Sequence, residues 1–295
     1  MKILIIGSKG FIGNHCVKYF SKTNQVFGCD VVASTEKKYF LIQNPADFDK
    51  IFSSEKFDLC INASGSADVG FSLKFPEKDY ELNVNNVERI LEAMKKYSPA
   101  CKLINFSSAA VYGNPQLLPV SESAEINPLS VYGKNKYKSE TILLKYHEED
   151  GLKTCSMRVF SAYGVGLKKQ LFWAIYQKSL QGKVVKLFGT GEESRDFIFI
   201  DDLVHSIDCI VQKADFCGQA INVSSGVETK IKDAAQLFLS CLGKDFNIEF
   251  SGEEKQGDPK NWKADISNLK QMDFTPFVTF EHGIKKYAEW LKGLE

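Results

Sequence analysis

The segment that most restricts the fold of this chain is residues 1–13. Lys2-Ile-Leu-Ile-Ile6 is a short apolar run rich in branched residues, which is typical of a strand buried on both faces. The glycine-rich Gly7-Ser-Lys-Gly10-Phe-Ile-Gly13 follows at once and leads into a helical stretch from Phe11 to Phe20. Glycines permit a tight turn and close backbone approach, and the start of a helix presents unpaired N–H groups. The segment predicts a cradle for a dinucleotide pyrophosphate, the alternative being a plain glycine turn, with cofactor contacts from Gly7, Gly10, Phe11, Ile12 and Gly13.

Two further strand ends extend this predicted cofactor site. The strand Gln25–Cys29 ends at Asp30, where a carboxylate can accept hydrogen bonds from a ribose and repel a 2′-phosphate. This favours NAD(H) over NADP(H), with the alternative that Asp30 only caps a turn. The strand Phe57–Ile61 leads into small residues, of which Ala63 and Gly65 would let the backbone lie against the nucleotide.

Tyr132-Gly-Lys-Asn-Lys136, downstream of Ser107-Ser108, suggests the chemistry of the site. A tyrosine with a reference pKa near ~10 is a poor base at neutral pH, and a cation one helical turn away stabilises its phenolate. We expect Tyr132 to move a proton, Lys136 to lower its pKa and hold a cofactor ribose, and Ser108 to hydrogen-bond the reacting oxygen. A Tyr and a Lys four apart also occur on ordinary solvated helices.

Short apolar runs alternate with helical stretches over the first half of the chain. Strands are expected near residues 2–6, 25–29, 57–61, 101–106 and 154–160, and helices near 11–22, 80–97 and 132–149. This alternation predicts an α/β fold with a Rossmann-type doubly wound parallel sheet. The carboxyl ends of parallel strands share one edge, which would gather Gly7, Asp30, Gly65, Ser108 and Phe160 at one crevice.

The pattern weakens after residue 160, where a helix at Phe172–Gln181 and short strands at Val184–Phe188 and Phe197–Ile200 are expected. We expect residues 1–160 to form an NAD-binding domain, completed by segments from about 195–225. Residues 161–295 would mainly form a smaller α/β C-terminal substrate-binding domain.

Composition narrows the classes of partner. The 295 residues are 44% apolar, and 37 basic residues balance 37 acidic ones, so charge suggests no nucleic-acid and no membrane partner. The eight cysteines include no close CxxC pair and no His/Cys cluster, which predicts reduced core residues and no metal site. A strand beginning at Lys2 leaves no room for a signal peptide, so we expect a cytoplasmic protein.

Several motifs occur together in this chain. They are Gly7-x-x-Gly10-x-x-Gly13, Asn83-Val84, Ser107-Ser-Ala-Ala-Val-Tyr-Gly113, Tyr132-x-x-x-Lys136, Arg158-Val-Phe-Ser-Ala-Tyr-Gly164 and Gly191-x-x-x-Arg195-Asp-Phe197. The combination resembles the extended short-chain dehydrogenase/reductase family, in its nucleotide-sugar epimerase/dehydratase branch. The resemblance spans nearly the whole chain and implies bound NAD, a nucleotide-diphosphate sugar as substrate and a homodimer built on the helices near 80–97 and 132–149.

The resemblance also implies roles for single residues. Arg195 matches the arginine that binds the substrate diphosphate, the alternative being a surface ion pair, and Lys255 stands where a second arginine is usual. Gln170 matches an asparagine that touches sugar or phosphate, and Phe188 an aromatic residue that meets the base, although both could simply pack. On the cofactor side, Asn44 replaces an adenine-binding acid, and Asn83 and Phe160 complete the set.

One position discriminates among the reactions of this branch. Its dehydratases carry an acidic residue just after the serine, because a carbon-bound proton must be removed. Here Ala109 and Ala110 stand there, which disfavours elimination. We therefore expect a 4-epimerase that oxidises C4 transiently, with a 4-ketoreductase using NAD(P)H as the alternative. A dinucleotide sensor without turnover is a third reading, which the presence of Ser108, Tyr132 and Lys136 disfavours.

Overall fold

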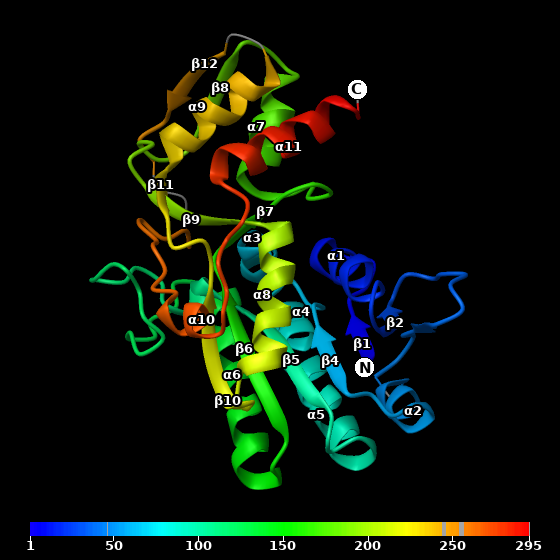
Figure 1. The fold of residues 1–295 in the computed structure, drawn as a ribbon. Helices are drawn as coiled ribbons and strands as arrows, with labels where there is room; N and C mark the ends of the chain where they lie inside the picture. Colours follow the sequence, from blue (N-terminus) through cyan, green and yellow to red (C-terminus); the bar gives the residue numbers. More distant parts are fainter. Residues whose placement is uncertain (46, 244–245, 254–256, 295) are drawn as a thin grey trace.

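The computed structural model describes residues 1–45, 47–243, 246–253 and 257–294. A seven-stranded sheet in the order β10-β6-β5-β4-β1-β2-β3 forms its centre (Figure 1). Neighbouring strands of this sheet run parallel. The strands are β1 (Lys2–Ile6), β2 (Gln25–Asp30), β3 (Tyr39–Leu41), β4 (Leu59–Asn62), β5 (Lys102–Ser108), β6 (Lys153–Val159) and β10 (Cys217–Val223).

Both faces of this sheet are covered, as the apolar runs in the sequence predict. Ile3 and Ile5 of β1 belong to one hydrophobic cluster, whereas Leu4 and Ile6 point into another. Helices α1 (Phe11–Phe20) and α8 (Ile200–Lys213) pack into the first cluster. Helices α2 (Asp47–Ser54), α5 (Asn86–Tyr97) and α6 (Val131–Asp150) pack into the second. The fold is therefore a doubly wound, Rossmann-type α/β sheet.

Short helical segments fill the connections near the carboxyl edge of the sheet. They are α3 (Val69–Lys74), α4 (Pro76–Tyr80), the π-helical turn η1 (Glu81–Asn85) and the 3₁₀ turn η2 (Ala109–Val111). Because α4, η1 and α5 follow one another without a break, they form one long helical segment.

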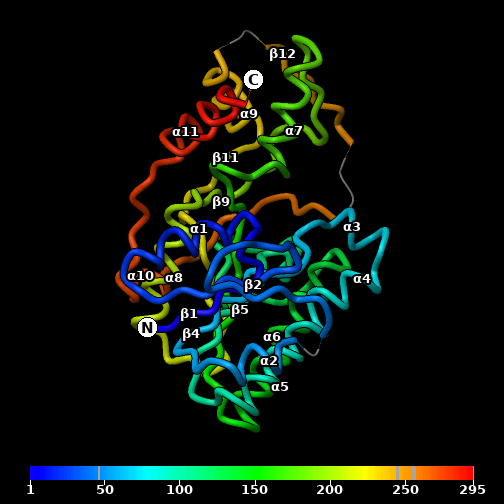
Figure 2. Tube along the Cα trace, turned by 90° about the vertical axis from the view of Figure 1, so that its right-hand side faces the viewer, coloured from blue at the N-terminus to red at the C-terminus, as the bar shows by residue number. Residues whose placement is uncertain are grey.

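The remaining elements form a smaller α/β part. It contains a three-stranded sheet in the order β11-β9-β7 and a two-stranded sheet of β12 and β8. The strands are β7 (Ser161–Tyr163), β8 (Val184–Leu187), β9 (Ser194–Phe199), β11 (Glu228–Lys230) and β12 (Asn247–Phe250). The helices are α7 (Gln170–Ser179), α9 (Ile231–Leu242) and α11 (Phe280–Lys292), whereas α10 (Ser267–Gln271) packs against β10 and α8 of the large sheet. Two views place α7, α9 and α11 at the end of the molecule opposite α5 (Figures 1 and 2).

The predicted elements agree well with this fold. The five expected strands are β1, which has the expected ends, and β2, β4, β5 and β6, whose ends are shifted by no more than two residues. The helix expected near 80–97 begins earlier, at Pro76, and the strand expected at Phe197–Ile200 is β9. Sequence reasoning missed α2, although Phe48, Ile51 and Phe52 have helical spacing and are buried.

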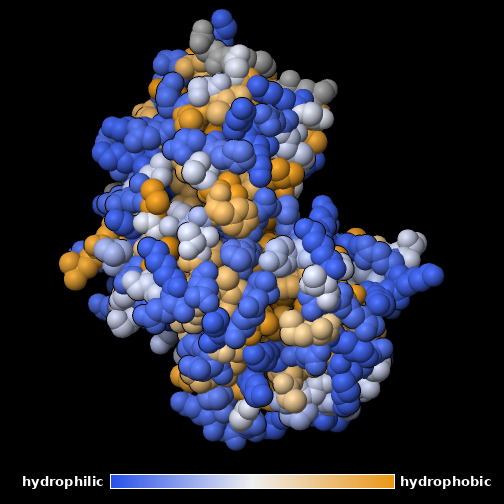
Figure 3. Space-filling view, in the orientation of Figure 1, coloured by the Kyte–Doolittle hydropathy of each residue, from blue (hydrophilic) through white to orange (hydrophobic). Residues whose placement is uncertain are grey.

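The surface is largely hydrophilic in the view of Figure 3, with apolar residues scattered over it. No helix within the described ranges is both long and apolar enough to cross a membrane. All eight cysteines are free thiols, and six of them are buried.

Candidate active site

The glycines between β1 and α1 are required by close packing. Gly7 has a φ of +80°, and a Cβ built on it would lie 2.7 Å from the Ala63 carbonyl oxygen. A Cβ on Gly13 would lie 2.1 Å from the carbonyl oxygen of Gly7. No side chain among the described residues caps the start of α1 at Gly10. The turn therefore leaves the first N–H groups of α1 available for an anion, which fits a dinucleotide pyrophosphate.

Asp30 lies beside this turn at the end of β2. Its Oδ2 accepts a hydrogen bond from the backbone N–H of Lys9 at 2.9 Å, and its Oδ1 accepts one from Val31 at 2.7 Å. Lys9 in turn pairs with Glu36 at 2.8 Å. The carboxylate is thus fixed next to the glycine turn, where the sequence placed a ribose acceptor.

The backbone after β4 passes close to a buried asparagine. Gly65 has a φ of +101°, and a Cβ there would lie 2.5 Å from Oδ1 of Asn83. Asn83 is 1% exposed, and its Oδ1 has no hydrogen-bond partner within the described part of the chain. An unsatisfied buried acceptor costs free energy, so its presence at this crevice is an observation in favour of a bound polar group. Both the glycine cradle and this acceptor fit NAD.

The three expected catalytic side chains meet at one end of a cavity of about 940 Å³. Ser108 ends β5, while Ser130 caps α6 by accepting from Gly133 N at 3.1 Å and so sets Tyr132 in the first helical turn. The backbone N–H of Tyr132 donates to Ser72 Oγ of α3 at 3.1 Å. One turn later, Lys136 Nζ donates to the carbonyl oxygen of Phe106 at 2.8 Å.

Burial controls the ionisation of this pair. It raises the pKa of Tyr132 to about 12, while a hydrogen bond with Ser108 lowers that pKa and the charge of Asp79 raises it. Burial also lowers the pKa of Lys136 to about 8, against the charges of Asp79 and Glu140. Lys136 Nζ lies 5.8 Å from the centroid of the Tyr132 ring. The net shift of the Tyr132 pKa in the protein alone is upward, because desolvation outweighs the hydrogen bond with Ser108; that Lys136 lowers this pKa stays a prediction.

A buried ion pair lies behind the catalytic end. Arg158 Nη2 is 2.7 Å from Glu140 Oε2, with both side chains less than a tenth exposed. Glu140 also accepts a hydrogen bond from Ser107, the neighbour of Ser108. Arg158 Nη1 donates to the Tyr112 hydroxyl at 2.8 Å, and that hydroxyl donates to Asn222 at 2.7 Å. The network ties α6 to β5, β6 and β10.

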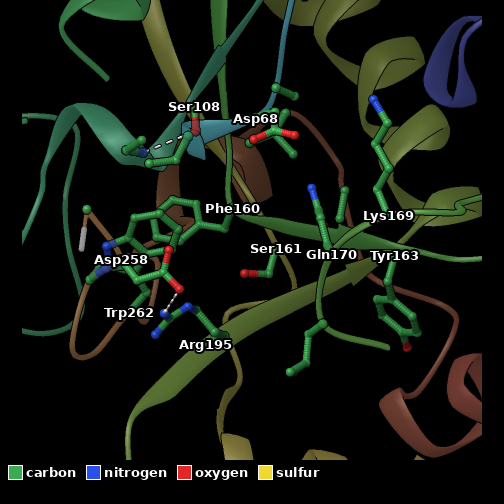
Figure 4. A pocket seen from close by; sticks show the side chains of 18 of the residues that line it. Asp68, Ser108, Phe160, Ser161, Tyr163, Lys169, Gln170, Arg195, Asp258 and Trp262 are labelled. Carbon is green, nitrogen blue, oxygen red and sulfur yellow. Dashed lines mark hydrogen bonds and ion pairs between the residues drawn. The ribbon is translucent and has the colours of Figure 1, made fainter. Parts of the chain in front are cut away.

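The opposite end of the cavity is built by the smaller α/β part (Figure 4). Arg195 of β9 donates to the carbonyl oxygens of Ser194 at 2.8 Å and Lys260 at 3.2 Å. Its guanidinium lies 4.0 Å from Asp258 and over the ring of Trp262. Burial lowers the pKa of Arg195, although an arginine stays charged at neutral pH.

Gln170 stands at the start of α7, directed into the same cavity (Figure 4). Its φ of +65° is rare for a residue other than glycine. No side chain of the described residues caps this helix at Lys169. The free N–H groups of α7 therefore add to the positive potential near Arg195.

The structure gathers most of the predicted site residues around the cavity. Its lining includes Ile12, Ala63, Gly65, Ser108, Tyr132, Lys136, Phe160, Gln170, Phe188 and Arg195. The lining does not include the other predicted cofactor residues Gly7, Gly10, Phe11, Gly13, Asp30 and Asn83. Asn44 is exposed in the loop before α2, with its N–H on Asp47 at 2.9 Å. Lys255 lies outside the described residues.

Sequence reasoning missed three acidic residues near the site, namely Asp68, Asp79 and Glu140. Glu140 could have been found, because Tyr132, Lys136 and Glu140 repeat at a spacing of four and so share one helix face. Asp79 gives no such local signal. Within the described ranges, no group of three His, Cys, Asp or Glu side chains is arranged to hold a metal ion.

Residues 3–224 match the NAD dependent epimerase/dehydratase family. Among curated proteins, the UDP-glucose 4-epimerase of Mycolicibacterium smegmatis is 26% identical over 313 residues, which cover 99% of this chain and 99% of that relative.

Solved structures give the same picture. The UDP-glucose 4-epimerase of Thermotoga maritima, solved with UDP-glucose, has a TM-score of 0.91 at 26% identity and covers 100% of both chains. The UDP-glucuronic acid 4-epimerase of Bacillus cereus, solved with UDP-glucuronic acid and NAD, has a TM-score of 0.91 at 25% identity, again over 100% of both. These two neighbours differ in the charge of their sugar.

Proposed function

The chain belongs to the NAD dependent epimerase/dehydratase family, and from this premise we propose that it is a 4-epimerase of nucleotide-diphosphate sugars. NAD is its cofactor. The observation that carries the proposal is the meeting of Ser108, Tyr132 and Lys136 at one end of a large cavity. The neighbouring positions 109 and 110 are alanines, so no carboxylate stands there to remove a proton from carbon.

On the cofactor side, we propose that the turn from Gly7 to Gly13 holds the pyrophosphate and that Asp30 accepts from the adenosine ribose. Ala63, Gly65, Asn83, Lys136 and Phe160 would hold the remainder, and Asn44 would lie near the adenine. NAD, when bound, supplies a positively charged ring that accepts a hydride and returns it. Residues 1–160 would thus hold the cofactor, and residues 161–295 most of the substrate.

On the substrate side, we propose that Arg195 and Gln170 bind the diphosphate and that Phe188 packs on the base. A guanidinium with free N–H groups at the start of α7 suits two phosphates. Phe188 lines the cavity and is 56% exposed, so its ring is accessible to a planar base. For Lys255 we also propose a phosphate contact, and this proposal rests on the sequence alone.

The catalytic end can move a proton on oxygen in both directions. Tyr132 as phenolate takes the proton of the C4 hydroxyl, while Ser108 hydrogen-bonds the same oxygen and Lys136 stabilises the phenolate. After the 4-keto sugar has rotated in the site to present its opposite face, Tyr132 returns the proton. A positive charge near the ring lowers the pKa of a tyrosine, so cofactor binding is expected to offset the burial that raises this pKa to about 12.

The test separates the epimerase from the 4-ketoreductase. Purified protein is analysed for copurified dinucleotide and then incubated with UDP-, dTDP-, GDP- and CDP-sugars without added cofactor. Interconversion of C4 epimers supports the proposal. Turnover of a 4-keto sugar that requires added NAD(P)H would favour the reductase, and bound dinucleotide without any product would favour the sensor.

The sugar end of the cavity carries an acidic side chain. Asp68 lines the cavity and caps α3, accepting from Phe71 N at 2.9 Å, next to the helix that holds Tyr132. At this end Lys136 donates to the Phe106 carbonyl oxygen, and Lys169 also lines the cavity (Figure 4). We propose that the sugar carries no carboxylate, because a uronate would meet a like charge here.

We expect UDP-glucose or UDP-N-acetylglucosamine to exceed UDP-glucuronate in kcat/KM by at least about tenfold, which corresponds to about 1.4 kcal/mol of discrimination. Asp68→Asn should narrow this ratio, since asparagine still caps a helix but carries no charge. The ratio is measured on wild type and variant in parallel. A preference for UDP-glucuronate in the wild type would contradict the charge argument and leave the epimerase proposal intact.

We further propose a homodimer formed through α5 and α6. Apolar side chains are exposed on α6, with Tyr137 at 37% and Leu144 at 40%, and on η1, which continues into α5, with Leu82 at 37%. Light scattering should therefore give about twice the chain mass of 33.1 kDa. Tyr137→Glu should shift the population toward monomer, whereas a wild-type monomer at every concentration would refute the dimer.

A further inference from the structure

Asp79 is a fully buried acidic residue next to the catalytic helix. It lies in α4 with 0% of its surface exposed. Its Oδ2 accepts from Asn135 Nδ2 at 2.8 Å and its Oδ1 accepts from Asn83 Nδ2 at 3.1 Å. Both oxygens act as acceptors, as in an ionised carboxyl group. Neither partner is charged, so the balancing charge must come from farther away.

The partners of Asp79 connect it to both halves of the site. Asn135 stands between Tyr132 and Lys136 on α6, one residue before the lysine. Asn83 points its unpaired Oδ1 at Gly65 in the cofactor crevice. The carboxylate of Asp79 therefore fixes the position of α6 relative to Asn83 in the cofactor crevice.

We propose that Asp79 is a positioning residue that serves as the buried counterion of Lys136 and sets the pH range in which the Tyr132–Lys136 pair works. The proposal rests on the proposed function, since that range concerns the proton moved by Tyr132. Lys136 has no ion-pair partner within 4.0 Å among the described residues, so Asp79 acts on it through space in a region of low dielectric constant.

The other charged groups around the pair are already engaged. On α6, Glu140 pairs with Arg158 of β6, and Lys138 lies over the ring of Tyr80 on α4. On η1, Glu81 pairs with Arg89 of α5. Glu92 of α5 binds Tyr146 near the far end of α6, and on α3 Lys74 lies over the ring of Phe75. Asp68 at the start of α3 also has no cation in direct contact within the described part of the chain, but it is exposed and caps its own helix. Asp79 is thus the buried acid near both members of the pair that has no cation of its own in direct contact, within the same described residues.

The directions of the pKa shifts agree with this geometry. Burial lowers the pKa of Lys136 to about 8, and the charge of Asp79 opposes the fall. Burial raises the pKa of Tyr132 to about 12, and Asp79 raises it further. A negative charge favours the protonated form of each group, so Asp79 keeps Lys136 cationic and makes Tyr132 harder to ionise.

Removing the charge should therefore lower both pKa values. Activity requires ionised Tyr132, which sets the acid limb of the pH profile, and protonated Lys136, which sets the alkaline limb. We expect Asp79→Asn to move both limbs of the kcat profile to lower pH, by about one unit. Asp79→Glu should restore the wild-type position of the limbs.

The experiment compares these variants with NAD bound. Two readouts are used: the pH profile of epimerisation, and NMR titration of tyrosine labelled at Cζ, with the Tyr132 signal assigned by Tyr132→Phe. Asn135→Ala removes the hydrogen bond but keeps the charge, so turnover should fall without a downward move of the limbs. Asp79→Ser is a second neutral replacement should Asp79→Asn fail to fold.

The two readouts separate the possible failures. If no nucleotide sugar is turned over, the proposed function fails, while the NMR titration of Tyr132 still tests Asp79. If both neutral variants lower activity equally at all pH values and leave the Tyr132 titration unmoved, Asp79 is merely structural and the inference is overturned.

Discussion

Tyr132→Phe is expected to lower turnover by about 10²- to 10⁴-fold, the range that a positioned acid/base group contributes. The substitution removes a single hydroxyl. The ring of Tyr132 is 8% exposed and keeps its packing, and its backbone N–H keeps the bond to Ser72. The loss should therefore fall on kcat, because the proton of the sugar hydroxyl has no acceptor left.

Cofactor affinity and thermal stability of this variant should stay close to wild type, since a lost hydrogen bond to Ser108 costs about 1 kcal/mol. Tyr19→Phe is a matched control, because its hydroxyl donates to Asp208 outside the cavity. Single-turnover measurements with bound NAD would check the chemical step. Wild-type kcat in Tyr132→Phe would rule out the assigned role.

Arg158→Met is expected to destabilise the fold by about 3–5 kcal/mol, as is usual when one partner of a buried ion pair is removed. Arg158 makes three hydrogen bonds to the Glu140 carboxylate, at 2.7, 3.0 and 3.1 Å. It also donates to Tyr112 and to the carbonyl of Glu122. The variant would leave the carboxylate of Glu140 buried, with Ser107 as a neutral donor.

The free energy of unfolding in urea measures this effect. The double variant Arg158→Met with Glu140→Leu should recover much of the loss, since no charge is then left buried. The comparison of single and double variants gives the coupling energy of the pair. If Arg158→Met lowered the free energy of unfolding by less than about 1 kcal/mol, water would have to reach Glu140. The ion pair would then not be what holds Ser107 in place.

Much of the fold could be predicted because its signals are local. β1 buries alternate residues in two clusters, and this appears in the sequence as an unbroken apolar run. The glycine turn is also visible in the sequence, because Gly7 and Gly13 occupy positions where any side chain would overlap the backbone. The short strand β3 and helix α2 were missed because they depend on docking against β2 and α5 rather than on a long periodic pattern.

The sequence by itself determined which groups we propose as catalytic. Tyr132 and Lys136 are four residues apart, and the 3.6-residue turn of a helix brings such side chains to one face whatever the surrounding fold. Ala109 and Ala110 likewise exclude a carboxylate at those positions without any structure. These inferences need only covalent spacing and residue chemistry.

Only the tertiary structure decided how those groups ionise. Asp79 and Asn135 are 56 residues apart in sequence, and no local pattern predicts their contact. Burial, which raises the pKa of Tyr132 and lowers that of Lys136, is likewise a property of the packed molecule. The reason is physical: helical spacing is set by the backbone over a few residues, whereas desolvation and through-space charge depend on what the whole fold packs around a group.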